Sequence, residues 1–143
     1  MRALVIDDER IARQELRRLL AAHPKVEIAG EAASGEQALE LIQKLAPDLL
    51  LLDIQMPAMT GFDLLDRLRD VPDVIFTTAY DQHALKAFEV NALDYLLKPI
   101  APARLAAALQ KVRPHPVRQA PVRQTMEQVF FTRWRTLLDR QNP

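Results

Sequence analysis

Two apolar runs of this sequence end in carboxylates. Residues 3–6 are followed directly by Asp7 and Asp8, and the four leucines at 49–52 are followed by Asp53. A short apolar run that stops at a charge is typical of a buried parallel strand whose carboxyl end opens into a crevice, where open α/β sheets bind their ligands. We therefore expect the three carboxylates to lie together at one edge of a sheet.

Two further apolar runs end in other polar groups. Residues 74–77 lead into Thr78, and residues 95–97 lead into Lys98, which precedes Pro99. Each residue taken alone has an ordinary structural explanation, such as a helix cap for the paired acids, a turn for the single acid, a locally bonded hydroxyl or a solvated ammonium group. Because four strand ends together carry the residue types that one reaction needs, we interpret them as a functional site.

The expected cluster of carboxylates requires a cation. Neighbouring carboxylates repel one another and raise each other's pKa, so a site that keeps them ionised needs positive charge. Mg²⁺ suits a set of oxygen ligands, and it characteristically combines one or two carboxylates with phosphate oxygens. The pattern therefore predicts phosphoryl chemistry, with Lys98 as a second positive charge and Thr78 as a hydroxyl donor.

The alternation of short apolar runs with amphipathic segments predicts an α/β fold, in which helices cover both faces of a parallel sheet. Ser34 has the character of a helix N-cap, with Gln37 three residues further on. We expect strands near residues 3–7, 26–30, 49–53, 73–78 and 94–97. We expect helices near residues 9–22, 34–45, 60–69, 82–90 and 102–112.

The composition indicates a small soluble protein. A chain of 143 residues suffices for one domain with its own core, and 49% hydrophobic with 27% charged residues is ordinary for a globular protein. No apolar stretch approaches the ~20 residues of a membrane span, and the first apolar run meets Asp7 too early for a signal peptide. We therefore expect a cytoplasmic protein with no membrane contact. The absence of cysteine excludes disulfides and thiolate metal sites.

The net charge of the chain is zero, but its acidic and basic residues are unevenly distributed. Residues 1–94 contain 10 basic and 17 acidic groups, whereas residues 95–143 contain 9 basic and 2 acidic groups. Directly after residue 113, three prolines lie among basic residues, which is typical of an extended linker. We divide the chain into a domain over 1–113, a linker over 114–125 and a short tail over 126–143.

Over residues 2–113 the chain resembles the receiver domains of two-component response regulators. The shared features are the acid pair Asp7-Asp8, the single acid in Asp53-Ile54-Gln55-Met56-Pro57, and the pairs Thr78-Ala79 and Lys98-Pro99. The resemblance implies a flavodoxin-like, doubly wound sheet of five parallel strands in the order 2-1-3-4-5. It also implies a cis peptide bond between Lys98 and Pro99.

The resemblance assigns a role to each acid. Asp53 corresponds to the phosphoacceptor, and a sensor histidine kinase would supply the phosphoryl group. Asp8, Asp53 and the main-chain carbonyl of Gln55 correspond to the Mg²⁺ ligands. Asp7 would act on the metal through water.

The remaining positions correspond to catalytic and switch residues. Thr78 and Lys98 would assist catalysis, and Thr78 with Tyr95 would form a conformational switch. Tyr95 is equally well explained as a half-buried packing aromatic. Gln55 and Tyr80 occupy the positions that tune loss of the phosphoryl group, and the bulk of Tyr80 predicts slow hydrolysis. Phosphorylation would pair two copies through helix 82–90, strand 94–97 and helix 102–112.

Residues 7–13 and 88–95 resemble more specifically the LytR/AlgR-like regulators, whose output is a LytTR DNA-binding domain. Only 30 residues follow residue 113, which is too few for an independent core. We therefore expect the output domain to be absent or truncated, with residues 127–131 as a candidate for its first strand. Contact with DNA would depend on that missing domain.

Two other functional classes stay open. A phosphohydrolase would use Asp53 as its nucleophile, but such sites typically carry a second acid two residues further on, where this chain has Gln55. A phosphorylation-independent interaction module or a stand-alone receiver is the other alternative, although a module of that kind would not need the intact set Asp8, Asp53, Thr78 and Lys98. We predict a phosphoacceptor that catalyses its own phosphorylation and dephosphorylation, is not a turnover enzyme, and controls transcription through an output domain.

Overall fold

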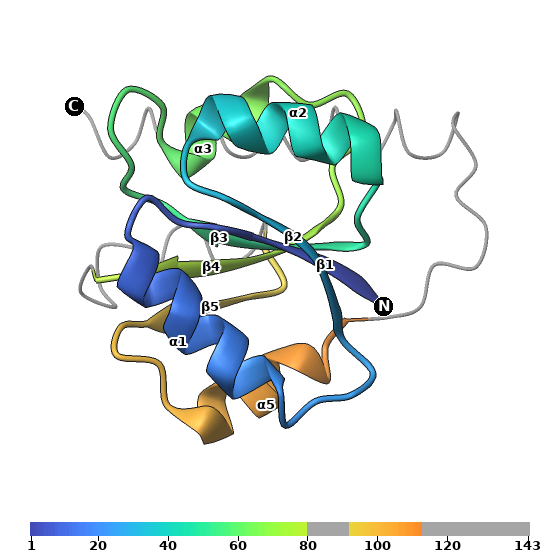
Figure 1. Ribbon diagram of the computed structural model, residues 1–143, viewed down its shortest axis with the longest axis vertical. Helices are drawn as coiled ribbons and strands as arrows, with labels where there is room; N and C mark the ends of the chain where they lie inside the picture. Colours follow the sequence, from blue (N-terminus) through green and yellow to red (C-terminus); the bar gives the residue numbers. More distant parts are fainter. Residues whose placement is uncertain (80–91, 113–143) are drawn as a thin grey trace.

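The computed structural model describes residues 1–79 and 92–112 (Figure 1). Four of the predicted features lie outside these residues, namely Tyr80, helix 82–90, the linker 114–125 and the tail 126–143. In chain order the described elements are β1 (Arg2–Ile6), α1 (Arg10–Leu20), β2 (Glu27–Ala32), α2 (Gly35–Leu45), β3 (Leu49–Asp53), α3 (Gly61–Asp66), β4 (Asp73–Thr78), β5 (Asp94–Leu97) and α5 (Pro102–Leu109).

The strands form one parallel sheet in the order β2-β1-β3-β4-β5. Figure 1 shows α1 and α5 on one face of this sheet and α2 and α3 on the other. The predicted doubly wound, flavodoxin-like fold and its strand order are therefore confirmed. In such a sheet every strand points the same way, so the carboxyl ends of all strands meet at one edge.

Two hydrophobic cores flank the sheet, because successive side chains of a strand point to opposite faces. On β1, Leu4 and Ile6 belong to the core under α2 and α3, whereas Ala3 and Val5 belong to the core under α1 and α5. The strand β3 is buried on both faces along its whole length, including its last residue, Asp53. The site residue at the end of β3 thus rests on the most deeply buried strand of the sheet.

The element ends differ from the sequence prediction at several points. The predicted strands 49–53, 73–78 and 94–97 are confirmed. The strand predicted at 26–30 instead runs from Glu27 to Ala32, because β2 carries one extra residue between Ile28 and Gly30 and its pairing with β1 continues until Ile6 meets Ala32. Residue 7 was predicted to end the first strand but lies one residue beyond it.

The helices end earlier than predicted. The helices expected to reach residues 22, 69 and 112 end at Leu20, Asp66 and Leu109. Past the residue that caps each helix, the next main-chain N–H groups bond to the carbonyl three residues earlier, as in a 3₁₀ turn, and no longer to the carbonyl four residues earlier. The longest described helices, α1 and α2, have 11 residues each, and none in this part of the chain is long and apolar enough to cross a membrane.

The predicted cap of α2 is confirmed. The Ser34 hydroxyl accepts a hydrogen bond from the Gln37 main-chain N–H at 3.1 Å. The Gln37 side chain reaches back and accepts a hydrogen bond from the Ala33 N–H at 2.8 Å. The first bond satisfies an N–H group that a helix start leaves without a partner, and the second ties the residue before the cap to the first turn, so together they fix the turn between β2 and α2.

Candidate functional site

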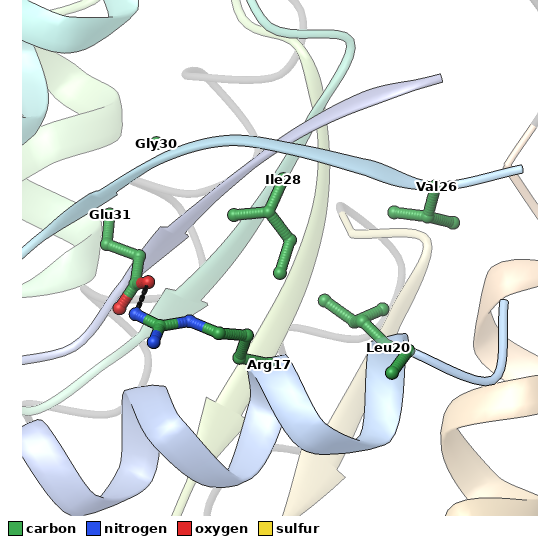
Figure 2. A pocket seen from close by; sticks show the side chains of 7 residues that line it. Arg17, Leu20, Val26, Ile28, Gly30 and Glu31 are labelled. Carbon is green, nitrogen blue, oxygen red and sulfur yellow. Dashed lines mark hydrogen bonds and ion pairs between the residues drawn. The ribbon is translucent and has the colours of Figure 1, made fainter. Parts of the chain in front are cut away.

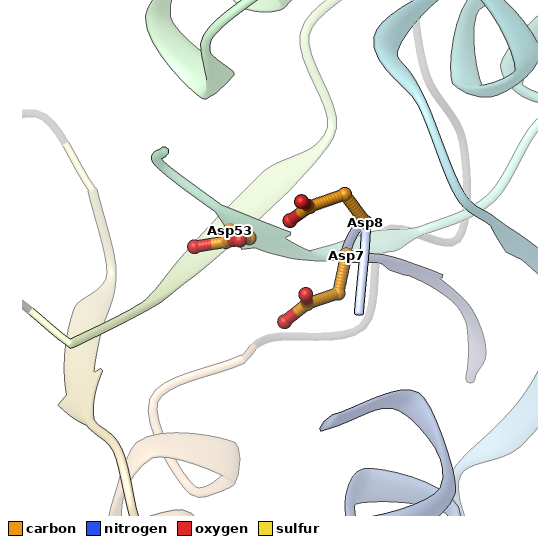
Figure 3. A group of neighbouring side chains, drawn as sticks. All are labelled: Asp7, Asp8 and Asp53. Atoms are coloured by element: carbon orange, nitrogen blue, oxygen red, sulfur yellow. The ribbon is translucent and has the colours of Figure 1, made fainter. Parts of the chain in front are cut away.

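Three carboxylates meet at the carboxyl edge of the sheet. Asp7 and Asp8 follow β1 directly, and Asp53 ends β3, which pairs with β1 up to Leu52. One carboxylate oxygen from each acid lies within 4.8 Å of the other two (Figure 3). Asp7 is 0% and Asp53 3% exposed, whereas Asp8 is half-buried. The predicted gathering of the three acids is therefore confirmed.

Lys98 brings a positive charge to this cluster from the end of β5. Its Nζ lies 2.7 Å from Asp7 Oδ2 and 3.6 Å from Asp53 Oδ2. The Lys98 main-chain N–H donates to the Thr78 carbonyl at 2.7 Å, and the Lys98-Pro99 peptide bond is cis, as expected. Burial lowers the pKa of Lys98, but its hydrogen bond to Asp7 and the nearby carboxylates outweigh this effect, so the pKa is raised and the ammonium stays charged.

The cluster holds more negative charge than Lys98 balances. The pKa of Asp53 is raised to about 7, first by burial and then by the charge of Asp7 and a hydrogen bond with the Asp8 carboxyl. The Lys98 ammonium and a main-chain hydrogen bond from Gln55 act in the opposite direction without overcoming it. A buried carboxyl group with so high a pKa gains free energy from any added cation.

The ligand set fits Mg²⁺. The three candidate ligands are carboxylates, which is the donor chemistry that a hard divalent cation prefers. Asp8 is half-buried, so this side of the cluster leaves room for the water ligands that Mg²⁺ retains. The predicted roles of the Gln55 carbonyl as a ligand and of Asp7 through water stay predictions.

The two predicted switch residues lie on neighbouring strands. Thr78 is fully buried at the end of β4. Tyr95 on β5 is half-buried and packs against the core under α2 and α3, and its register partner on β4 is Phe76, a member of that core. This packing agrees with both interpretations of Tyr95, the switch aromatic and the packing aromatic, so its switching role stays a prediction.

One glycine at the site was not predicted. A Cβ on Gly61 would lie 2.7 Å from the main-chain oxygen of Asp53, which is closer than real Cβ contacts. The Gly61 N–H donates to the Ile54 carbonyl at 2.8 Å. The start of α3 therefore lies directly against the end of β3, and only glycine permits this approach. The sequence signal that was available is the pair Thr60-Gly61, in which Thr60 is the N-cap of α3 and Gly61 its first helical residue.

An arginine beside the acid pair was also missed. Arg13 on α1 donates from Nη1 to the main-chain oxygen of Asp7 at 2.7 Å, and its Nε lies 3.5 Å from Glu31 on β2. The sequence gives no hint of this pairing, because Arg13 and Glu31 lie on different elements and meet only after β2 pairs with β1.

Comparison with known proteins agrees with this architecture. The family model of the response regulator receiver domain matches residues 3–110. An uncharacterized response regulatory protein of Vibrio cholerae serotype O1 is 51% identical over 112 residues, which cover 77% of this chain and 47% of that protein. The sensory transduction protein LytT of Bacillus anthracis is 43% identical over 130 residues, 89% of this chain and 53% of LytT.

Two further comparisons point the same way. The transcriptional regulatory protein BtsR of Salmonella typhi is 44% identical over 115 residues, 79% of this chain and 48% of BtsR. The crystal structure of the response regulatory domain of protein mrkE from Klebsiella pneumoniae superposes with a TM-score of 0.68 at 36% identity, covering 78% of this chain and 94% of that one. The chain spans about half the length of the curated relatives it matches. It belongs to the response regulator receiver domain family of two-component systems, with LytT proteins among its relatives.

Proposed function

We propose that this chain accepts a phosphoryl group on Asp53 from a phosphohistidine of a sensor histidine kinase, in a reaction that depends on Mg²⁺. The observation that carries the proposal is the cluster itself. Three carboxylate oxygens lie within 4.8 Å of one another, and the Lys98 ammonium lies 3.6 Å from Asp53. Phosphoryl transfer needs this combination of a carboxylate nucleophile and groups that neutralise phosphoryl oxygens.

The proposed step is an in-line displacement. A carboxylate oxygen of Asp53 attacks the phosphorus, the new P–O bond forms, the P–N bond breaks, and its electron pair stays on the imidazole. Asp53 must be ionised to attack, and its pKa of about 7 without metal leaves it only partly ionised at neutral pH. Bound Mg²⁺ would supply the positive charge that keeps Asp53 ionised and neutralises the phosphoryl oxygens.

Lys98 and Thr78 would stabilise the phosphorylated form of Asp53. Phosphorylation adds about −1.5 to −2 charges beside Asp7 and Asp8, which calls for positive charge and hydrogen-bond donors at the new oxygens. Lys98 already lies between Asp7 and Asp53, so a small shift of its ammonium would let it pair with the phosphoryl group. The Thr78 hydroxyl would be drawn toward the same group, and Tyr95 would turn into the space that it leaves.

The proposed output is self-association. The surface formed by helix 82–90, β5 and the helix that starts at residue 102 would pair with a second copy after phosphorylation. Of this surface the structure describes β5 and α5. Gln55 and Tyr80 would set the lifetime of the phosphoryl group. In this proposal residues 1–113 form the receiver, 114–125 the linker and 126–143 a tail.

Control of transcription through an output domain is part of the same proposal. LytT carries the name of a sensory transduction protein and BtsR that of a transcriptional regulatory protein, and both are about twice as long as the part they share with this chain. The protein would act in the cytoplasm, where sensor kinases and DNA are both accessible. It would not turn over substrates, since Gln55 stands where phosphohydrolases typically carry an acid.

Intact-mass spectrometry after incubation with acetyl phosphate tests the proposal. We expect one phosphoryl adduct with Mg²⁺, none with excess chelator, and none in Asp53→Asn. Asp94→Asn is the matched control, because it removes a different buried carboxylate and should leave labelling intact. Labelling of Asp53→Asn at the wild-type rate, or labelling that chelator does not affect, would contradict the assignment. Turnover of small phosphate esters would favour the phosphohydrolase instead.

A further inference from the structure

We propose that Arg13 is a positioning residue for the acid cluster. Its guanidinium, held by Glu31 on β2, fixes the peptide unit that joins Asp7 to Asp8. The inference rests on the proposed Mg²⁺-binding role of the cluster. It adds a residue on α1 that touches neither the metal nor the phosphoryl group and acts through the acid pair.

The contact of Arg13 with the acid pair is to the main chain. Arg13 Nη1 donates to the Asp7 carbonyl oxygen at 2.7 Å. This oxygen belongs to the peptide bond between Asp7 and Asp8, so its orientation determines the directions in which both side chains leave the backbone. A donor fixed on this oxygen therefore limits the positions of two of the three carboxylates at once.

Glu31 holds the guanidinium from its other side. Arg13 Nε lies 3.5 Å from Glu31 Oε1, and the two side chains are only 17% and 21% exposed. The planar guanidinium thus links α1, β2 and the loop after β1. Lysine has one nitrogen and cannot reach two such acceptors with the same fixed geometry.

The remaining polar contacts of Asp7 hold other parts of the residue, and the ion pair of its Oδ2 with Lys98 at 2.7 Å is one of them. The Asp7 N–H donates to the Ala32 carbonyl at 3.0 Å, and Asp7 Oδ1 accepts from the Glu9 N–H at 2.9 Å. These bonds hold the amide and the side chain of Asp7, whereas Arg13 holds its carbonyl. Without Arg13, the part-buried carbonyl loses this partner, and the orientation of the peptide unit is less restricted.

A positioning role and a purely electrostatic role of Arg13 predict opposite changes in the affinity for Mg²⁺. This difference makes the inference testable. If Arg13 acted only through its positive charge, it would compete with Mg²⁺ for the carboxylates, and its removal would tighten metal binding. If it positions the peptide unit, its removal weakens metal binding, because the ligands are no longer held in place. Glu31 offsets part of the charge of Arg13, and the hydrogen bond from Arg13 to the acid pair is to a main-chain oxygen, so positioning is the effect we expect to dominate.

The same helix offers a matched control. Arg17, one turn further along α1, pairs with the same Glu31 (Figure 2). Its side chain is 58% exposed and lines a shallow groove of about 450 Å³ with Leu20, Val26 and Ile28. Arg17→Gln therefore removes the same charge from the same helix and the same partner while leaving the hydrogen bond from Arg13 to Asp7.

The first experiment is calorimetric titration of Mg²⁺ into the wild-type chain, Arg13→Gln, Arg13→Lys and Arg17→Gln. We expect Kd to rise about tenfold in both Arg13 variants and to change less than about twofold in Arg17→Gln. The lysine variant keeps the charge, so a wild-type Kd there would overturn the proposal. Tighter binding by Arg13→Gln would also overturn it and would assign Arg13 a role through charge.

A second readout needs no metal. In metal-free protein we expect amide hydrogen exchange at Asp7 and Glu9 to be faster in Arg13→Gln than in Arg17→Gln, at equal global stability by urea unfolding. Equal exchange in the two variants would overturn the positioning role. If the wild-type chain bound no Mg²⁺, the proposed function would fail, and the exchange rates would still decide whether Arg13 holds the acid pair.

Discussion

Two buried aspartates at opposite edges of the sheet have opposite electrostatic surroundings. Asp53 ends β3 at the carboxyl edge, and Asp94 begins β5 at the amino edge. They are 3% and 7% exposed. Burial raises the pKa of both, but for Asp94 hydrogen bonds from Arg104, Tyr95 and Lys111 more than offset it, so its pKa is lowered. For Asp53 the pKa rises to about 7.

The neighbours account for this difference, since residue type and exposure are nearly the same. Asp94 accepts from the Tyr95 N–H at 2.8 Å and pairs with Arg104 at 3.0 Å and Lys111 at 3.1 Å. Asp53 instead faces two carboxylates and one ammonium. A carboxylate with a full set of partners ties elements together, whereas one that lacks positive charge is suited to bind a cation or attack an electrophile.

The largest expected difference is in reaction rate. Lys98→Met should lower the rate of Mg²⁺-dependent phosphoryl labelling about a hundredfold, because it removes the ammonium that faces Asp53. Arg104→Met removes a cation from Asp94 instead and should leave the rate within about twofold. Time courses of labelling by mass spectrometry measure both rates. Equal losses in the two variants would show that the distinction between the two aspartates has no chemical consequence.

The next effect is on stability. Asp94→Ala should lower the free energy of unfolding by about 2 kcal/mol at pH 7, because it leaves the Tyr95 N–H without its acceptor and two half-exposed cations without their pair. Since the folded-state pKa of Asp94 is lowered, its contribution is present above the ordinary value of 3.8 and is lost as pH falls through the lower folded value. Urea unfolding at pH 7 and below pH 3 measures this. A variant as stable as wild type at pH 7 would contradict it.

The contribution of Asp53 to stability should depend on pH in the opposite direction to that of Asp94. The pKa of Asp53 is raised from 3.8 to about 7, so its contribution to stability is present below 3.8 and is lost as pH rises to about 7. In metal-free protein Asp53→Asn should therefore stabilise the fold, by roughly 1–2 kcal/mol at pH 8 after allowance for solvent screening, and by little at pH 4. Urea unfolding with chelator at both pH values measures the gain. Destabilisation at pH 8 would contradict the prediction.

The smallest effect concerns Thr77, the register partner of Asp53 on β4. The Thr77 hydroxyl is buried and has no hydrogen-bond partner among residues 1–79 and 92–112. Thr77→Val replaces it by a methyl group of similar size and should stabilise the fold by about 1 kcal/mol. Thr77→Ser keeps the hydroxyl and should not stabilise it. Thermal unfolding compares the two, and a less stable valine variant would show that the hydroxyl is satisfied in solution.

Most residues of the site at the carboxyl edge of the sheet, where Asp53 lies, could be predicted from the sequence, because local patterns indicate them. The apolar runs before Asp7, Asp53 and Lys98 indicate strands, and parallel strands bring their carboxyl ends together. The resemblance to receiver domains then supplied the strand order. The ends of α1, α3 and α5 were predicted too late, since apolar spacing continues into turns that no longer form helical hydrogen bonds.

The electrostatic contrast could not be predicted, because it depends on contacts between distant elements. The pair Asp94–Arg104 joins β5 to α5, and the pair Arg13–Glu31 joins α1 to β2. No spacing rule in the sequence selects these partners from the other charged residues. The shift of the Asp53 pKa likewise depends on its burial at the end of a strand that is covered on both faces.

The direct test of the central claim is a titration of the aspartate carboxyl carbons by NMR, with and without Mg²⁺. In metal-free protein Asp53 should titrate with a midpoint of about 7 and Asp94 below the ordinary value. Saturating Mg²⁺ should lower the midpoint of Asp53 and leave that of Asp94 unchanged. A midpoint for Asp53 near 3.8 in metal-free protein, unaffected by Mg²⁺, would contradict the account.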